Sequence, residues 1–304
     1  MLGRLTTFAV RYLYADRIVR FLPSYKHSIG KMHSKPKIVQ KSNISVHVLP
    51  ALSDNYMYMV IDNKTQEAVI IDPADAKTVQ SYLEQNPEIK LKAVLATHHH
   101  WDHVGGVLEI VKNLPGIPVY GGDSRCDGLT NMIKKSDPNV KITENLQFKV
   151  HFTPCHTQGH VCFYHESEGV VFTGDTLFLG GCGRFFEGTA VEMNEALNVK
   201  LASLPDETEV FCGHEYTLSN LKFALHVEPD NEKLDEYYKV CENKRLAGEP
   251  TIPGSIGQEK EVNPFMRVGS SVSLMKLAKE VGGDEVESSD DVMRVIRGMK
   301  DSFK

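Results

Sequence analysis

Four imidazoles and one carboxylate stand within the seven residues 97–103, which read Thr-His-His-His-Trp-Asp-His. Imidazole and carboxylate are side chains that bind zinc and similar ions, and packing gives no reason to place so many of them together. With 13 His in 304 residues, a chance cluster of surface histidines of this density is expected in roughly one or two chains per hundred. The segment therefore predicts a metal site.

The elements on either side of this segment must position its side chains. The apolar run 93–96 before it is typical of a buried strand, and the run 104–108 after it is typical of the start of a helix. The ligands are therefore expected where a strand ends and a helix begins, a usual place for sites in α/β proteins.

Extended chain separates the three consecutive histidines. His98 and His100 point to one face and His99 to the other, so we expect His98 and His100 to bind one ion together. Asp102 and His103 follow on the turn, close enough to hold a second ion beside the first.

Two ions need more ligands than this segment offers, and three later residues can supply them: His160, Asp175 and His214. Each stands at one end of a short β-rich run and near glycine, which repeats the setting of the first cluster. Taken singly, each has an ordinary alternative, because a lone His is often a hydrogen-bonded core residue and a lone Asp often forms a turn. Their combination with 97–103 favours ligands.

Longer sequence runs carry a resemblance to a known family. With its metal motif, the chain resembles the metallo-β-lactamase-fold hydrolases, and within them the glyoxalase II (hydroxyacylglutathione hydrolase) family. The closer likeness rests on the runs Leu49–Tyr58, Gly181–Thr189, Cys212–Thr217 and Asn263–Arg267, and it extends over about residues 45–304.

The resemblance implies a binuclear centre. His98, His100 and His160 would hold one ion, Asp102, His103 and His214 the second, and Asp175 would bridge the two, with a hydroxide shared between them. The implied reaction is hydrolysis of the thioester S-D-lactoylglutathione to D-lactate and glutathione, the second step of methylglyoxal detoxification. Such ligands fit zinc best, although iron or manganese would also be accepted.

The resemblance also implies a substrate site. Positions matching Arg297 and Lys300 bind the glycine carboxylate of glutathione, and Tyr216 matches a residue that contacts its peptide part. Arg184 and Phe186 match positions where relatives carry Lys and Tyr, so Phe186 lacks a hydroxyl for one hydrogen bond. Three neighbours complete the expected site: Phe185, His214 and Glu215. Taken without the family, cations near a helix C-terminus simply complement its dipole.

The expected fold is α/β. Residues 44–217 should form an αββα sandwich of the metallo-β-lactamase type, with a helix at 76–85 and a capping box at Thr189–Glu192. Residues 218–304 should form a smaller, mostly helical substrate-binding domain with helices at 231–246, 271–281 and 289–303.

The N-terminus has a different composition from the rest of the chain. Residues 1–53 hold nine Lys or Arg and one acidic residue, giving +8 there against −14 for the remainder. The Arg-bearing, acid-poor segment Met1–Gly30 is typical of a mitochondrial transit peptide, the alternative being a disordered basic tail. We expect residues 1–43 to be a transit peptide and flexible N-terminus of a matrix protein, with a possible cytosolic form starting at Met32.

Other functions are disfavoured. The acidic body argues against a nucleic-acid partner, and no apolar run of 18 residues is present to span a membrane. Six Cys without CxxC spacing indicate a reducing compartment. We expect a monomer acting on a glutathione thioester. The alternatives are a glutathione persulfide dioxygenase of the same fold, which would hold one iron, and a non-catalytic metal-binding scaffold, which would have lost ligands.

Overall fold

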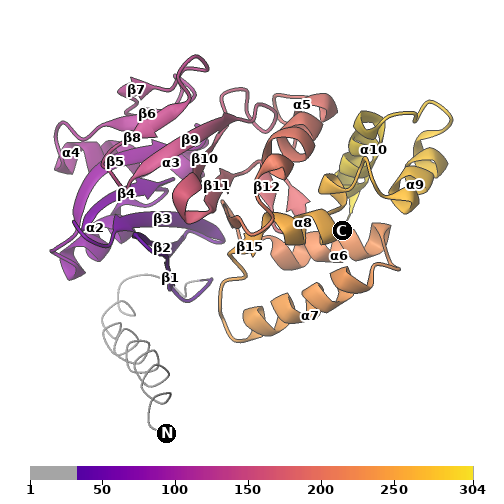
Figure 1. The fold of residues 1–304 in the computed structure, drawn as a ribbon, viewed down its shortest axis with the longest axis horizontal. Coiled ribbons are helices and arrows are strands. Elements are labelled where there is room, and N and C mark those ends of the chain that lie inside the picture. Colours follow the sequence, from indigo (N-terminus) through magenta and orange to yellow (C-terminus); the bar gives the residue numbers. More distant parts are fainter. Residues whose placement is uncertain (1–32, 304) are drawn as a thin grey trace, which may run out of the picture. The chain divides into compact units, whose positions relative to one another are not determined.

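The computed structural model describes residues 33–303, so the expected transit peptide and the alternative start at Met32 lie outside the described residues. Residues from His33 onward form one compact unit. In this unit two β-sheets lie between helices (Figure 1), which confirms the expected sandwich.

The first sheet has seven strands in sequence order: β1 (Lys37–Gln40), β2 (Ile44–Ala51), β3 (Asn55–Asp62), β4 (Glu67–Ile71), β5 (Lys90–Ala96), β6 (Val119–Gly121) and β7 (Asn131–Met132). Strands β1 to β4 are antiparallel, whereas β4, β5, β6 and β7 run parallel. The parallel strands have their carboxyl ends at one edge of the sheet, where ligand sites form.

The second sheet has the order β15-β14-β11-β10-β9-β8. Its strands are β8 (Asn139–Lys141), β9 (Gln147–Phe152), β10 (Val161–His165), β11 (Val170–Gly174), β14 (Glu209–Cys212) and β15 (Gly254–Ser255). Strands β11 and β14 are parallel, so they too end at the same edge. A short hairpin of β12 (Leu177–Phe178) and β13 (Gly181–Cys182) follows β11.

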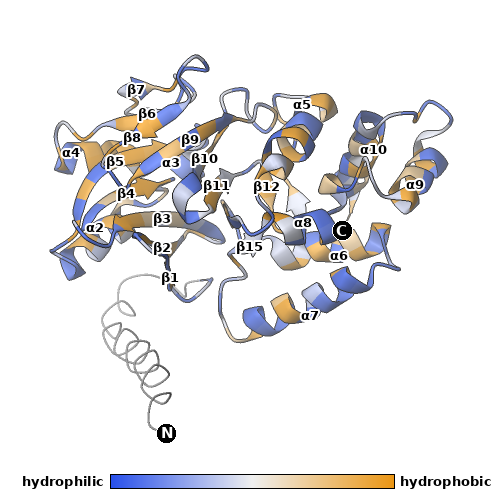
Figure 2. Ribbon diagram, viewed as in Figure 1, coloured by the Kyte–Doolittle hydropathy of each residue, from blue (hydrophilic) through white to orange (hydrophobic). Residues whose placement is uncertain are grey.

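Alternation along β3 explains why the two sheets and the outer helices form a layered core. Tyr56, Tyr58 and Val60 pack in the core that includes the second sheet, while Met57 and Met59 pack in a core with the helices α2 (Ala76–Gln85) and α4 (Val107–Asn113). A strand with both faces covered must be apolar throughout. Figure 2 shows this apolar character on the central strands.

The C-terminal part is helical, as expected. Its helices are α6 (Thr217–Val227), α7 (Glu232–Leu246), α8 (Ile256–Val262), α9 (Val272–Gly282) and α10 (Ser289–Ser302). Side chains of Asn231, Ser271 and Ser288 cap α7, α9 and α10, which is why these helices begin where the sequence predicts.

Helix α10 packs against α9 and against α5 (Ala190–Asn194), which joins the helical part to the sandwich. Thr189 and Glu192 form the expected capping box of α5. The helix continues through a π-helical turn at Glu195–Lys200 and a 3-10 turn at Leu201–Ser203. Among residues 33–303, no helix is long and apolar enough to cross a membrane.

The expectation of a flexible N-terminus up to residue 43 is wrong for residues 33–43. Residues 37–40 form β1, which pairs in register with β2, and Ser34 is buried. Strand pairing with β2 gives this polar segment backbone partners that the composition alone does not reveal.

Candidate metal centre

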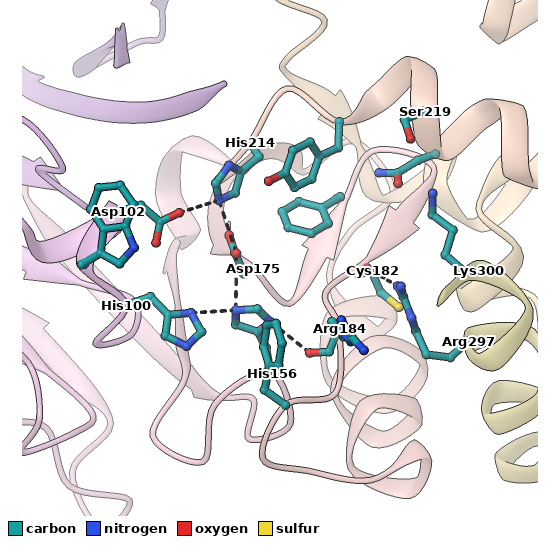
Figure 3. Close-up of a pocket in the computed structure, with 15 residues that line it drawn as sticks. His100, Asp102, His156, Asp175, Cys182, Arg184, His214, Ser219, Arg297 and Lys300 are labelled. Atoms are coloured by element: carbon teal, nitrogen blue, oxygen red, sulfur yellow. Dashed lines mark hydrogen bonds and ion pairs between the residues drawn. The ribbon is translucent and has the colours of Figure 1, made fainter. Parts of the chain in front are cut away.

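Four loops at one edge of the two sheets carry the metal-binding side chains. The loop after β5 and the short helix α3 (Trp101–Val104) carry His98, His100, Asp102 and His103. Loops after β9, β11 and β14 bring in, respectively, His156, Asp175 and His214. Figure 3 shows several of these side chains pointing toward one another around Asp175.

The first group consists of His98, His100 and His156, whose ligand atoms all lie within 4.8 Å of one another. His100 Nδ1 is 3.0 Å from His98 Nε2 and 3.1 Å from His156 Nε2. His99 does not join the group; its Nδ1 lies 3.5 Å from Asp123 Oδ2. The alternation expected for the extended segment is therefore present.

The second group consists of Asp102, His103 and His214. The Nε2 atoms of His103 and His214 are 3.2 Å apart, and Asp102 Oδ2 lies 3.5 Å from His214 Nε2 and 3.9 Å from His103 Nε2.

Asp175 lies between the two groups. Its Oδ1 is 3.3 Å from His103 Nε2, and its Oδ2 is 3.4 Å from the Nε2 atoms of both His156 and His214. Oδ1 is buried and has no hydrogen-bond partner in the described chain. A Cβ on Gly213 would lie 2.4 Å from this oxygen, so glycine is required for the close approach.

The residues present fit two divalent ions. A tetrahedral ion about 2.0–2.1 Å from each imidazole nitrogen separates those nitrogens by about 3.3 Å, close to the 3.0–3.2 Å spacings within the two groups. Imidazole nitrogens at such spacings do not carry enough protons to form hydrogen bonds with one another. The buried Oδ1 of Asp175 beside them also has no hydrogen-bond partner among the described residues. A cation between them resolves both deficits.

Outer hydrogen bonds orient the histidines. His103 Nδ1 donates to Asp72 Oδ2 at 2.9 Å, His214 Nδ1 donates to Asp54 Oδ1 at 2.7 Å, and His156 Nδ1 donates to the carbonyl of Arg184 at 3.0 Å. Each bond directs Nε2 toward the centre and raises its basicity. The sequence analysis missed Asp72, although it directly follows β4 just as Asp175 follows β11.

The pKa values of the histidines in the centre are shifted in different directions. Burial, and then the neighbouring imidazole of His103, lower the pKa of His98 well below its ordinary value. Burial alone would lower the pKa of His214, but Asp175 and Asp54 offset this and raise it to about 9. A cation bound by His214 must therefore displace a proton, so metal affinity should fall in acid.

His160, expected as a ligand, does not join either group. Its Nδ1 lies 3.0 Å from the hydroxyls of Thr153 and Thr176, and its Nε2 accepts the backbone N–H of Asp175 at 3.0 Å. Both nitrogens are thus occupied, and the expectation is corrected to His156, four residues earlier. His160 instead holds the backbone of the central aspartate.

A cavity of about 610 Å³ opens over the centre. His100, Asp102, His156, Asp175 and His214 lie in its wall at one end, and Arg184, Arg297 and Lys300 lie in its wall toward the helical part (Figure 3). Phe186 and Tyr216, both expected at the substrate site, also line it. The ring of Tyr216 stacks on His214 with centroids 4.6 Å apart.

The two cations expected to bind a carboxylate differ in their partners. Arg297 is buried and donates to the carbonyl of Cys182 at 2.9 Å and to Asp301 Oδ1 at 2.7 Å. Its Nε is buried and has no partner among the described residues. Lys300 is half-buried, and within residues 33–303 no acceptor lies within hydrogen-bonding distance of its Nζ. Lys300 is therefore the more available of the two.

Two expected substrate residues do not line the cavity. Phe185 packs against the central core. Glu215 accepts hydrogen bonds from Tyr56 Oη at 2.5 Å and from the backbone N–H and hydroxyl of Thr251, both at 2.8 Å. Their alternation with Phe186 and Tyr216 along the chain turns them inward, so we correct their role to packing and support.

Comparison with known proteins agrees with this site. Residues 53–214 match the family described as "Metallo-beta-lactamase superfamily", and residues 215–303 match "Hydroxyacylglutathione hydrolase C-terminus". "Hydroxyacylglutathione hydrolase cytoplasmic" of Arabidopsis thaliana is 43% identical over 261 residues, covering 84% of this chain and 98% of that protein. "Hydroxyacylglutathione hydrolase" of Pseudomonas aeruginosa (strain LESB58) is 41% identical, covering 86% of this chain and all of that protein.

Among solved structures, ETHE1 from Myxococcus xanthus superposes with a TM-score of 0.56 at 23% identity, covering 87% of this chain and 91% of that one. This likeness concerns the fold alone.

Proposed function

The chain belongs to the hydroxyacylglutathione hydrolase family of the metallo-β-lactamase superfamily, and we propose that it hydrolyses S-D-lactoylglutathione to D-lactate and glutathione with two divalent ions bound. The observation that carries the proposal is the position of Asp175 between two three-residue groups, at one end of a cavity whose other end presents cations.

In the proposed centre, His98, His100 and His156 would hold one ion, Asp102, His103 and His214 would hold the other, and Asp175 would offer its carboxylate to both. Two such ions, when bound, supply Lewis acidity and lower the pKa of water to about 7. Among the liganding groups, the charges of Asp102 and Asp175 offset part of the charge of the ions, and Asp54 and Asp72 fix the imidazoles.

The remaining cavity residues position the substrate. Lys300 and Arg184 offer positive charge to the carboxylates of glutathione, and Tyr216 lines the same cavity with its ring stacked on His214. This arrangement would place the thioester next to Asp175. The thiol of glutathione has an ordinary pKa of about 8.5, so its thiolate can leave without a strong general acid. The cavity therefore does not need such an acid.

Zinc is the proposed ion, because mixed imidazole and carboxylate ligands suit it, although iron or manganese would also be accepted. The second group argues against a persulfide dioxygenase that holds a single iron, and the full ligand set argues against a non-catalytic scaffold.

The experiment that tests the function combines two measurements on the purified full-length protein. Thioester loss is followed on S-D-lactoylglutathione, and bound metal is counted by elemental analysis. We expect hydrolysis and close to two ions per chain. A metal-replete protein that leaves this thioester intact, or that oxidises glutathione persulfide instead, would contradict the proposal.

We also propose that residues 1–31 direct the chain to the mitochondrial matrix and that a product starting at Met32 stays cytosolic. The contrast between +8 in residues 1–53 and −14 in the remainder supports this. A reporter fused to residues 1–31 should enter mitochondria, and a reporter that remains in the cytosol would refute the mitochondrial location.

Since every residue of the centre and cavity comes from one chain, we propose that a monomer is active, to be checked by sedimentation.

A further inference from the structure

Residues 33–40, which we term the N-terminal arm, cross from the sandwich to the helical part. The arm precedes residues 53–303, over which the two families match. The backbone N–H of Lys35 donates to the carbonyl of Gly248 at 2.8 Å, and Lys37 Nζ donates to the carbonyl of Ile252 at 2.9 Å. Both acceptors lie in the loop after α7, so the arm joins β1 to that loop.

The first residue of the arm lies two hydrogen bonds from the second metal group. His33 Nε2 donates to the carbonyl of Asn55 at 2.9 Å. The side-chain amide of Asn55 in turn donates to the carbonyl and the Oδ2 of Asp102, at 2.9 Å and 3.2 Å. Asn55 also forms a β-bridge with His214. It therefore touches two of the three residues of the second group.

Ser34, the next residue of the arm, is held by Arg245 of α7. Arg245 donates to Ser34 Oγ at 2.8 Å and to the carbonyl of His33 at 2.5 Å, and its Nη1 lies 3.6 Å from Glu215 Oε2. Glu215 directly follows His214 and is held by Tyr56, whose ring meets that of His33 edge-on at 5.1 Å. These contacts hold the ring of His33 in the orientation in which its Nε2 donates to the carbonyl of Asn55.

We propose that His33 is a positioning residue of the second metal group, acting through Asn55 on Asp102 and His214, so that a working chain retains the N-terminal arm whichever start it uses. The proposal rests on the two-ion centre of the proposed function. The first group of His98, His100 and His156 has no hydrogen bond to the arm within the described residues.

The test uses full-length, zinc-loaded protein and two substitutions that separate the ring from its donor. His33→Phe retains a ring against Tyr56 and loses the N–H, whereas His33→Gln retains an N–H donor and loses the ring. Lys35→Ala is the matched control, because this side chain is exposed and makes no hydrogen bond among the described residues. Zinc release is measured against a competing chelator, with thermal unfolding recorded for each variant.

We expect His33→Phe to release one of its two zinc ions at about ten-fold lower chelator concentration, the low end of the effect of losing an outer partner of a metal site. The other ion should be released as in the parent. His33→Gln and Lys35→Ala should both resemble the parent. Equal zinc retention in His33→Phe and Lys35→Ala would overturn the proposal, and so would equal losses in His33→Phe and His33→Gln, since these would indicate packing alone.

The outcomes separate this role from the reaction itself. A parent that binds two zinc ions but leaves the thioester intact would overturn only the proposed hydrolysis. A parent that binds a single ion would overturn the two-ion centre and the role of the arm together. Mass spectrometry of the mature chain adds a second check, because its first residue should lie at or before His33. A mature two-ion chain that begins after His33 would contradict the proposal.

Discussion

Glu259 of α8 allows the pH dependence of stability to be worked out from one buried carboxyl. Its side chain is fully buried, and Oε2 accepts the backbone N–H of Gly180 at 2.7 Å and the amide of Asn263 at 2.8 Å, while Oε1 has no partner among the described residues. Burial raises the pKa of Glu259 from its ordinary 4.5 to about 7, against the opposing effect of these two hydrogen bonds.

The sign follows from proton linkage. Since the folded chain binds this proton more tightly than the unfolded chain, its contribution to stability is fully present below about pH 4.5 and is lost as the pH rises through about 7. Raising the pKa by about 2.5, at about 1.4 kcal/mol for each pH unit, amounts to about 3.5 kcal/mol. Glu259→Gln cannot ionise and still offers a carbonyl oxygen to Gly180, so it should be more stable than the parent at pH 8 by up to about 3.5 kcal/mol.

Urea unfolding of parent and variant at pH 5 and pH 8, both in the same chelating buffer, measures this difference. The gain from Glu259→Gln should be large at pH 8 and small at pH 5, and taking the difference cancels groups common to both proteins. Glu261→Gln on the same helix is the matched control, because Glu261 is half exposed and should show no such dependence. A stability difference that is the same at both pH values would refute the reasoning.

Three further predictions concern the site. Lys300→Met should raise KM for S-D-lactoylglutathione by about ten-fold to a hundred-fold with little change in kcat, because a charge-assisted hydrogen bond far from the thioester contributes about 1.5–3 kcal/mol to ground and transition states alike. Steady-state kinetics check this, and an unchanged KM would exclude carboxylate recognition by Lys300. Asp175→Asn should lower metal content and abolish most hydrolysis, since it removes the charge between the two groups; elemental analysis that finds two ions would exclude bridging. His156→Ala should lose an ion while keeping most of its thermal stability. His160→Ala should keep two ions and lower the free energy of unfolding by about 1–3 kcal/mol through its lost hydrogen bonds. The reverse pattern would restore His160 as the ligand.

Local sequence determined the elements and the first half of the site. Helix α2 has the bounds 76–85 that its pattern predicts, and Ser271 and Ser288 cap the helices they precede. The side chains 98–103 are close in sequence, so strand alternation and one turn were enough to separate His99 from its neighbours. Patterns of this kind depend on a few adjacent residues and can be read without the fold.

Tertiary structure alone decided which residue of 153–160 joins the first histidine group and which cations are available to a substrate. His156 and His160 flank the same turn, and the choice depends on Thr153, Thr176 and the Asp175 backbone, which occupy both nitrogens of His160. Likewise, the carbonyl of Cys182, from a distant part of the chain, accepts a hydrogen bond from Arg297. A hydrogen-bond partner brought from a distant segment removes a side chain from the ligand set, and its proximity is fixed by the packing of the whole chain.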